Sequence, residues 1–202
     1  MLTHTIQTIS SGRKLTAKLC LLLIFLSTSI GFAQPIQLSE DSIHVVDEEV
    51  VFSVKFTHDL SKEEFFGKSS YYLNNKLDPY SGAFTANNED ATTCIITDYL
   101  DVESNSINTY AMYVTYTLHL EYKDGYCNMT ISDITYMEKG YFETQEKSQR
   151  KLKMPKFSGK DVMIDKKFTW LLKRNSSEKV TKATIERFNE IIKNLDSAFS
   201  AK

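Results

Sequence analysis

Hydrophobic and polar residues alternate over a long stretch, residues 110–122, and this is the strongest pattern in the chain. The apolar or aromatic set is Tyr110, Met112, Val114, Tyr116, Leu118, Leu120 and Tyr122. A period of two places such a set on one face of a β-strand. Asp124-Gly125 follows and predicts a two-residue type I′ turn, because both central residues of that turn need positive φ. We therefore predict one long hairpin over residues 109–136.

The predicted turn also sets the register of the hairpin. It places Leu120 opposite Met129 and Leu118 opposite Ile131. The apolar sides of the two strands then coincide, whereas a slip of one residue would set apolar against polar side chains. After residue 131 the apolar positions change phase, which predicts a β-bulge near residues 132–133.

The other predicted elements lie on both sides of this hairpin. Alternating apolar residues predict a strand at 49–57, and a ragged pattern predicts another at 83–102. Ser61-Lys62-Glu63-Glu64 is a capping box that begins a helix, which we expect to end at Asp78-Pro79. Apolar residues at helical spacing predict a long helix over 178–199.

The order of elements indicates an α+β fold with a mostly antiparallel, curved sheet. It reads strand, helix, three strands and then a C-terminal helix. We expect the helices to cover one face, the side that carries Leu118, Leu120 and Ile131. The predicted organisation is an extended lead-in at 34–44, an α+β domain at 45–138, a basic connecting segment at 139–175, and a helix at 176–202 that packs on the domain.

The N-terminal segment resembles a secretory signal. Three basic residues precede an apolar run from Leu19 to Leu26, and Gly31-Phe32-Ala33 supplies small residues where a signal peptidase cleaves. The run is shorter than the ~20 apolar residues of a membrane span. We therefore expect cleavage after Ala33, no transmembrane segment in the mature chain, and an exported protein, periplasmic or secreted.

Charge is divided unevenly along the predicted mature chain. Residues 34–138 carry a net −13 and residues 139–175 a net +7. An acidic domain argues against nucleic acid as the partner, because phosphate neutralisation needs a basic surface. Export permits disulfides, but the predicted strand order places Cys94 and Cys127 on opposite sides of a central strand, so we expect two free, buried thiols.

The strand at 50–56, the helix opening at 60–64 and the hairpin over 116–134 resemble one family. It is a family of exported proteins of Bacteroidota-type bacteria, domain of unknown function 4468, and the resemblance covers residues 48–138. It implies a TBP-like fold, a curved sheet with helices on one side. It implies no active site, and a TBP-like fold does not imply DNA binding, because fold does not fix function.

The chain shows no catalytic or metal-binding signature. None of His44, His58 and His119 has the spacing of metal ligands, and no P-loop, G-x-S-x-G or dinucleotide motif occurs. We predict no catalytic residue, no metal and no cofactor. Asp98 interrupts an apolar strand face, which indicates either an exposed strand end or a functional carboxylate. An unfamiliar hydrolase-like site near His119 or Asp98 stays as an alternative.

Two surfaces remain as candidates for binding. The first is the outward face of the sheet, formed by Tyr113, Thr115, Thr117, His119, Glu121, Asn128 and Thr130. It favours a non-enzymatic module that binds a protein or another envelope component. The second is a basic cluster that would make weak contact with an anionic surface and attach the protein to the envelope: Lys147, Arg150, Lys151, Lys153 and Lys156. The alternative for this cluster is a solvated loop or a contact with the acidic domain.

Overall fold

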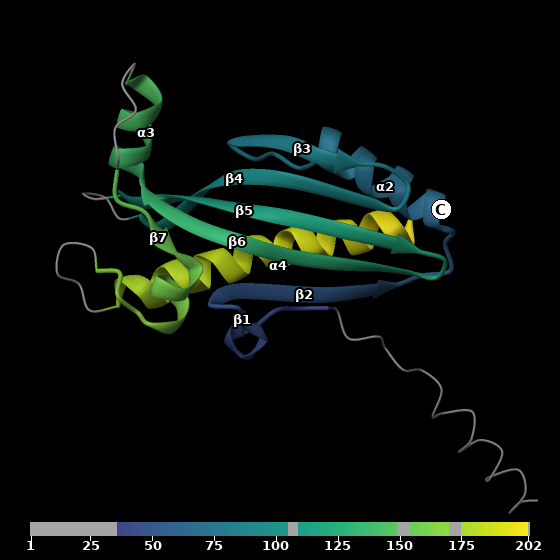
Figure 1. Ribbon diagram of the computed structural model, residues 1–202, viewed down its shortest axis with the longest axis horizontal. Coiled ribbons are helices and arrows are strands. Elements are labelled where there is room, and N and C mark those ends of the chain that lie inside the picture. The colour runs from purple at the N-terminus through teal and green to yellow at the C-terminus, as the bar shows by residue number, and fades with distance from the viewer. Residues whose placement is uncertain (1–35, 105–108, 149–153, 170–174, 202) are drawn as a thin grey trace, which may run out of the picture. The chain divides into compact units, whose positions relative to one another are not determined.

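The computed structural model describes residues 36–104, 109–148, 154–169 and 175–201 (Figure 1). Residues 1–35 belong to a separate unit. The predicted signal segment and its cleavage after Ala33 therefore lie outside the described residues. Within the described part, no helix is long and apolar enough to cross a membrane.

The described residues form one antiparallel sheet, in agreement with the predicted fold class. Its strand order is β1-β2-β6-β5-β4-β3, and β7 pairs with β6. The central strands are the long ones, and the strand at 49–57 is confirmed as β2. The bounds are β1 His44–Val46, β2 Glu49–Thr57, β3 Ser81–Asn87, β4 Ala91–Ser104, β5 Thr109–Lys123, β6 Tyr126–Glu138 and β7 Phe157–Ser158.

The predicted hairpin is confirmed as β5 and β6, in the predicted register. Leu118 pairs with Ile131, and Leu120 pairs with Met129. Gly125 in the turn has a φ of 84°, which a glycine adopts without steric cost. Asp124 does not have a positive φ, so the prediction of a type I′ turn is wrong, although the two-residue loop and its register are as predicted. The register shifts by one residue beyond Thr117, where Asp133 has a φ of 54°. This is the predicted bulge. It keeps the apolar side chains of β6 on both sides of it, such as Ile131 and Ile134, in the core.

Two helices cover the inward face of the sheet. They are α2, Lys62–Asn75, and α4, Ser176–Ser200, and Figure 1 shows α4 passing behind the strands. α4 buries the apolar stripe that its helical spacing predicts, including Phe188, Ile191 and Leu195. Phe188 packs edge-on against Phe52 at 5.5 Å and Tyr116 at 4.9 Å between ring centroids. The core therefore lies between the sheet and these two helices.

The capping box at the start of α2 is present as predicted. The Ser61 hydroxyl accepts from the Glu64 N–H at 3.2 Å, and the Glu64 carboxylate accepts from the Ser61 N–H at 2.8 Å.

We expect Ser61→Ala to lower the free energy of unfolding by about 1 kcal/mol, because the Glu64 N–H loses its acceptor. Chemical denaturation measures this loss. Ser197→Ala, at an exposed position in the last turn of α4, is the control, and an equal loss there would contradict the role of the cap.

The predicted single strand at 83–102 is wrong in one respect, since it is a hairpin of β3 and β4. Asn88 accepts through its side chain from the N–H groups of Asp90 at 2.9 Å and Ala91 at 3.1 Å. Such a side-chain-to-backbone turn reverses the chain. Cys94 of β4 pairs with Leu118 of β5, and Cys127 lies on β6 at the other side of β5, as predicted. Cys94 and Cys127 are free and buried, and burial raises the pKa of the thiols to about 11 and about 12.

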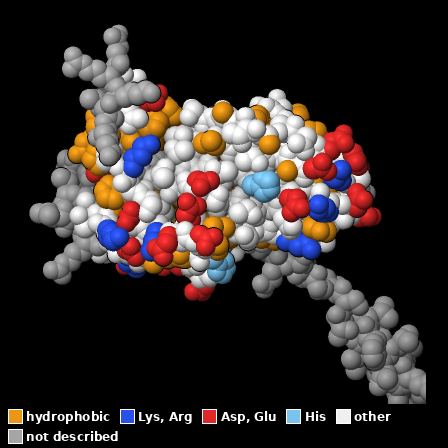
Figure 2. Space-filling model, in the orientation of Figure 1, with side chains coloured by type: hydrophobic (Ala, Val, Ile, Leu, Met, Phe, Trp, Pro, Cys, Tyr) orange, Lys and Arg blue, Asp and Glu red, His pale blue; other side chains and the backbone are white. Residues whose placement is uncertain are grey.

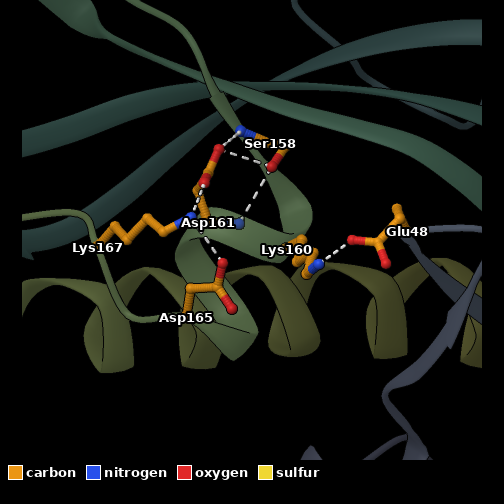
Figure 3. A network of polar contacts seen from close by, with 6 residues as sticks. All are labelled: Glu48, Ser158, Lys160, Asp161, Asp165 and Lys167. Atoms are coloured by element: carbon orange, nitrogen blue, oxygen red, sulfur yellow. Dashed lines mark hydrogen bonds and ion pairs between the residues drawn. The ribbon is translucent and has the colours of Figure 1, made fainter.

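The segment at 139–175 is not simply an exposed connection, because its described residues include regular structure. It contains α3, Lys139–Lys147, the strand β7 and a π-helical turn, Lys160–Ile164. Figure 3 shows how polar contacts hold this turn: Asp161 accepts from Ser158 at 2.7 Å, and Lys167 reaches Asp161 at 3.0 Å. These partners hold the pKa of Asp161 at about 2. Lys160 pairs with Glu48 of the acidic domain.

Candidate functional site

The outward face of the sheet brings together most of the predicted binding residues. One row runs across four strands, since Ser53 pairs with Thr130, Thr130 with His119, and His119 with Thr93. Four strands at their usual spacing make this row about 14 Å wide. We call the polar sheet face the set formed by Ser53, Thr93, Thr115, Thr117, His119, Glu121, Asn128, Thr130 and Ser132.

Most residues of the polar sheet face are half-buried by their neighbours in the sheet, and Ser53 is exposed. Figure 2 shows this side of the molecule, where uncharged polar side chains and backbone surround one histidine and charged side chains gather at the right-hand end. Hydroxyl, amide and imidazole groups both donate and accept hydrogen bonds. The middle of the face therefore suits a partner that forms neutral hydrogen bonds.

Two hydrogen bonds between neighbouring strands order the middle of the face. The Thr93 hydroxyl lies 2.8 Å from Nδ1 of His119, and the Thr97 and Thr115 hydroxyls are 2.9 Å apart. The bond to Thr93 fixes the orientation of the imidazole ring and leaves Nε2 for another partner. An imidazole held in this way presents one defined hydrogen-bonding group at the centre of the face.

Tyr113 does not belong to the open face, contrary to the prediction. It is 5% exposed because α3 covers this end of the sheet. Phe142 stacks on the Tyr113 ring at 4.0 Å, and Tyr80 packs edge-on at 4.8 Å. α3 therefore lies against the outward face, which also corrects the expectation that all helices pack on one side.

A charged group closes the opposite end of the polar sheet face. Lys123 reaches the Glu121 carboxylate at 3.0 Å and lowers the pKa of Glu121, with a smaller contribution from Asn128. Lys55 lies over the Tyr126 ring, 4.0 Å from its centroid. The face is thus bounded by aromatic residues at one end and by these paired charges at the other.

Asp98 is a buried core residue, so neither an exposed strand end nor an open carboxylate describes it. It is 2% exposed and lies on the face opposite His119. Arg187 of α4 donates to its two oxygens at 2.9 and 3.0 Å, and the Tyr116 hydroxyl donates at 2.8 Å. The contact with Tyr116 is buried, and the two contacts with Arg187 are part-buried at the edge of the core. Asp98 and His119 therefore do not form a common site.

No group of three or more His, Cys, Asp or Glu side chains in the part of the chain that the structure describes is arranged to hold a metal ion. His58 instead contacts Asp196 at 2.8 Å and packs beside Phe199. His44 is exposed in β1.

The basic cluster is only partly described. Arg150, Lys151 and Lys153 lie outside the described residues, whereas Lys147 and Lys156 are exposed. Three further lysines of the same segment are paired with carboxylates of the chain: Lys160 with Glu48, Lys166 with Glu178, and Lys167 with Asp161 and Asp165. Contact between the basic cluster and an anionic surface stays a prediction.

One functional feature was missed by sequence reasoning, a groove between α2 and α4. Its volume is about 660 Å³, and its walls include Gly67, Tyr71 and Ala198. No pattern in either helix alone predicts a groove, because it depends on how the two helices pack.

Comparison with known proteins relates this chain to one family. Residues 53–137 match the family model described as "Domain of unknown function (DUF4468) with TBP-like fold". A crystal structure of a DUF4468 family protein from Bacteroides ovatus is 17% identical, covers 80% of this chain and 92% of that chain, and has a TM-score of 0.60. A TBP-like protein from Parabacteroides distasonis is 15% identical, covers 79% and 97%, and has a TM-score of 0.59.

These two likenesses show the fold. No curated protein matches the chain significantly. The matched region begins within β2 and ends within β6, so it contains nearly all of the hairpin and every residue of the polar sheet face. Residues 53–137 of this chain therefore match the model of the family described as DUF4468 with TBP-like fold.

Proposed function

We propose that this chain is an exported, non-enzymatic binding module that uses the polar sheet face. One observation carries the proposal: none of the described helices covers a four-strand row of exposed or half-buried hydrogen-bonding side chains, whereas α3 covers the neighbouring end of the same face. The N-terminal signal pattern supports export. The partner surface that fits is uncharged and rich in hydrogen-bonding groups, since the middle of the face carries hydroxyl, amide and imidazole groups.

The described contacts of His119 and Asp98 support binding rather than catalysis. Within the described residues, the side-chain hydrogen bond of His119 is to the Thr93 hydroxyl and not to a carboxylate. A general base of the familiar kind is oriented by a third group and contacts a nucleophile. Asp98, the other candidate, is held in the core by Arg187.

Site-specific photo-crosslinking in the native cell envelope tests the proposal. A photoreactive phenylalanine analogue at Thr117 should yield a defined adduct. The same analogue at Lys182, whose side chain is 77% exposed on α4, is the matched control and should yield none. Adducts of equal yield at both positions, or none at Thr117, would contradict the use of the polar sheet face.

A further inference from the structure

The groove between α2 and α4 is separate from the polar sheet face. All its lining residues belong to the two helices or directly follow them, and no strand residue contributes. Its volume of about 660 Å³ lies within the roughly 300–1,000 Å³ that small-molecule sites occupy. The groove is therefore large enough for a ligand of its own.

A glycine in the middle of α2 widens this groove. Gly67 is exposed, and a Cβ built on it would meet no heavy atom within 4 Å. A glycine inside a helix costs about 0.5–1 kcal/mol relative to alanine. Close packing does not require it here, because the space above it is empty. The effect of Gly67 is to leave room along the wall of the groove.

The walls of the groove are largely apolar. Tyr71 is 59% exposed and borders the groove from α2, while Ala198 and Ala201 line it from the side of α4. Tyr72 is buried, and its hydroxyl hydrogen-bonds with Asn194. A large exposed aromatic ring beside small side chains favours contact with an apolar ligand.

Among the described residues that line the groove, two are lysines and none is an aspartate or glutamate. Residues 34–138 hold 18 acidic residues and 5 lysines, and Lys68 and Lys76 are two of those five. The Lys68 ammonium donates to the carbonyl oxygens of Ala198 and Ala201 at the end of α4. Lys76 forms no ion pair with any residue that the structure describes. An otherwise acidic domain thus presents an uncompensated cation at this groove.

We propose that the groove binds an amphiphilic anion, a single alkyl chain with one anionic headgroup. The chain would lie along Gly67 and Tyr71, and the headgroup would contact the Lys76 ammonium. Gly67 and Lys76 are nine residues apart, which is about 13 Å along a helix. Burial of the alkyl chain supplies the affinity, and the lysine selects the sign of the headgroup.

Titration calorimetry with monomeric sodium dodecanoate tests this proposal on the chain that begins at Gln34. Dodecanoate should bind with a 1:1 stoichiometry. Dodecyltrimethylammonium, which has the same chain and the opposite charge, should bind at least about 5-fold more weakly. Equal affinity for the two amphiphiles, or no binding of dodecanoate, would overturn the proposal. The proposal would also be overturned if the protein bound phosphatidylglycerol vesicles but did not bind monomeric dodecanoate.

Variants locate the site. Gly67→Leu fills the groove and should weaken dodecanoate binding 10-fold or more, while the higher helix propensity of leucine maintains the fold. Gly140→Leu in α3, where a Cβ also meets no heavy atom within 4 Å, is the matched control and should leave the affinity for dodecanoate unchanged.

Lys76→Gln should weaken dodecanoate binding about 2- to 5-fold. Lys76→Glu should make the groove bind dodecyltrimethylammonium more tightly than dodecanoate. Unchanged binding by Gly67→Leu would exclude the groove, whatever the outcome at the polar sheet face.

Discussion

Replacing Arg187 with methionine is expected to lower the free energy of unfolding by about 3–5 kcal/mol. The guanidinium makes two hydrogen bonds to Asp98, at 2.9 and 3.0 Å, from α4 to the inward face of β4. Asp98 is 2% exposed, so methionine would leave a buried carboxylate with only the Tyr116 hydroxyl as its partner. Urea denaturation at neutral pH measures the loss.

Two controls separate this ion pair from its surroundings. Arg187 also contacts Glu190 at 2.7 Å, but the Glu190 side chain is 57% exposed, so Glu190→Gln should cost less than about 1 kcal/mol. Replacing the whole buried group, as Asp98→Leu, Arg187→Met and Tyr116→Phe together, should restore most of the stability, because no buried polar group is left unpaired. A cost below about 1 kcal/mol for Arg187→Met alone would show that Asp98 is not held as described.

Truncating Phe188 to alanine is the second change with a large expected effect. It should lower the free energy of unfolding by about 3–5 kcal/mol. The ring is fully buried and packs edge-on against Phe52 of β2 and Tyr116 of β5. Its removal opens a cavity where α4 joins the sheet. Thermal and urea denaturation should agree on the loss.

The matched control for Phe188→Ala lies on the exposed side of the same helix. Glu186→Ala should change stability by no more than about 0.5 kcal/mol. A similar small effect from Phe188→Ala would mean that α4 does not pack on the sheet through this ring.

The parts of the fold that were predicted correctly depend on neighbours in the sequence. The hairpin register follows from alternation and the Asp124-Gly125 turn, and both act within a few residues. The start of α2 follows from Ser61 and Glu64 in the same way. The stripe of α4 needs only the helical period.

The errors arise where the structure depends on contacts between distant residues. Asp98 looked like an interruption of an apolar strand face, but its partner Arg187 lies 89 residues away. Tyr113 had the spacing of an outward residue, and α3 covers it through Phe142. The turn at Asn88 is the exception, because its Asn-Asn-Glu-Asp composition is a local turn signal that was overlooked.

For the candidate surfaces too, the parts that depend on neighbours in the sequence were predictable and the parts that depend on distant contacts were not. The face of the sheet on which Thr115, Thr117 and His119 lie follows from strand parity, so it was predictable. The identity of their neighbours Thr93 and Ser53 depends on which strands pair with β5 and β6. The groove beside Gly67 was not predictable, because it exists only where α2 and α4 meet.

The central proposal is that the polar sheet face acts as one binding surface across several strands, and a second substitution tests it most directly. The photo-crosslink formed from position 117 on β5 should disappear when Thr130→Lys is added on β6 or Ser53→Lys on β2, since each introduces a charge into the same row. Ser200→Lys on the exposed end of α4 should leave the adduct intact, and all three variants should keep the parent melting temperature. An adduct of unchanged yield in the Thr130→Lys and Ser53→Lys variants would contradict a shared surface on this face.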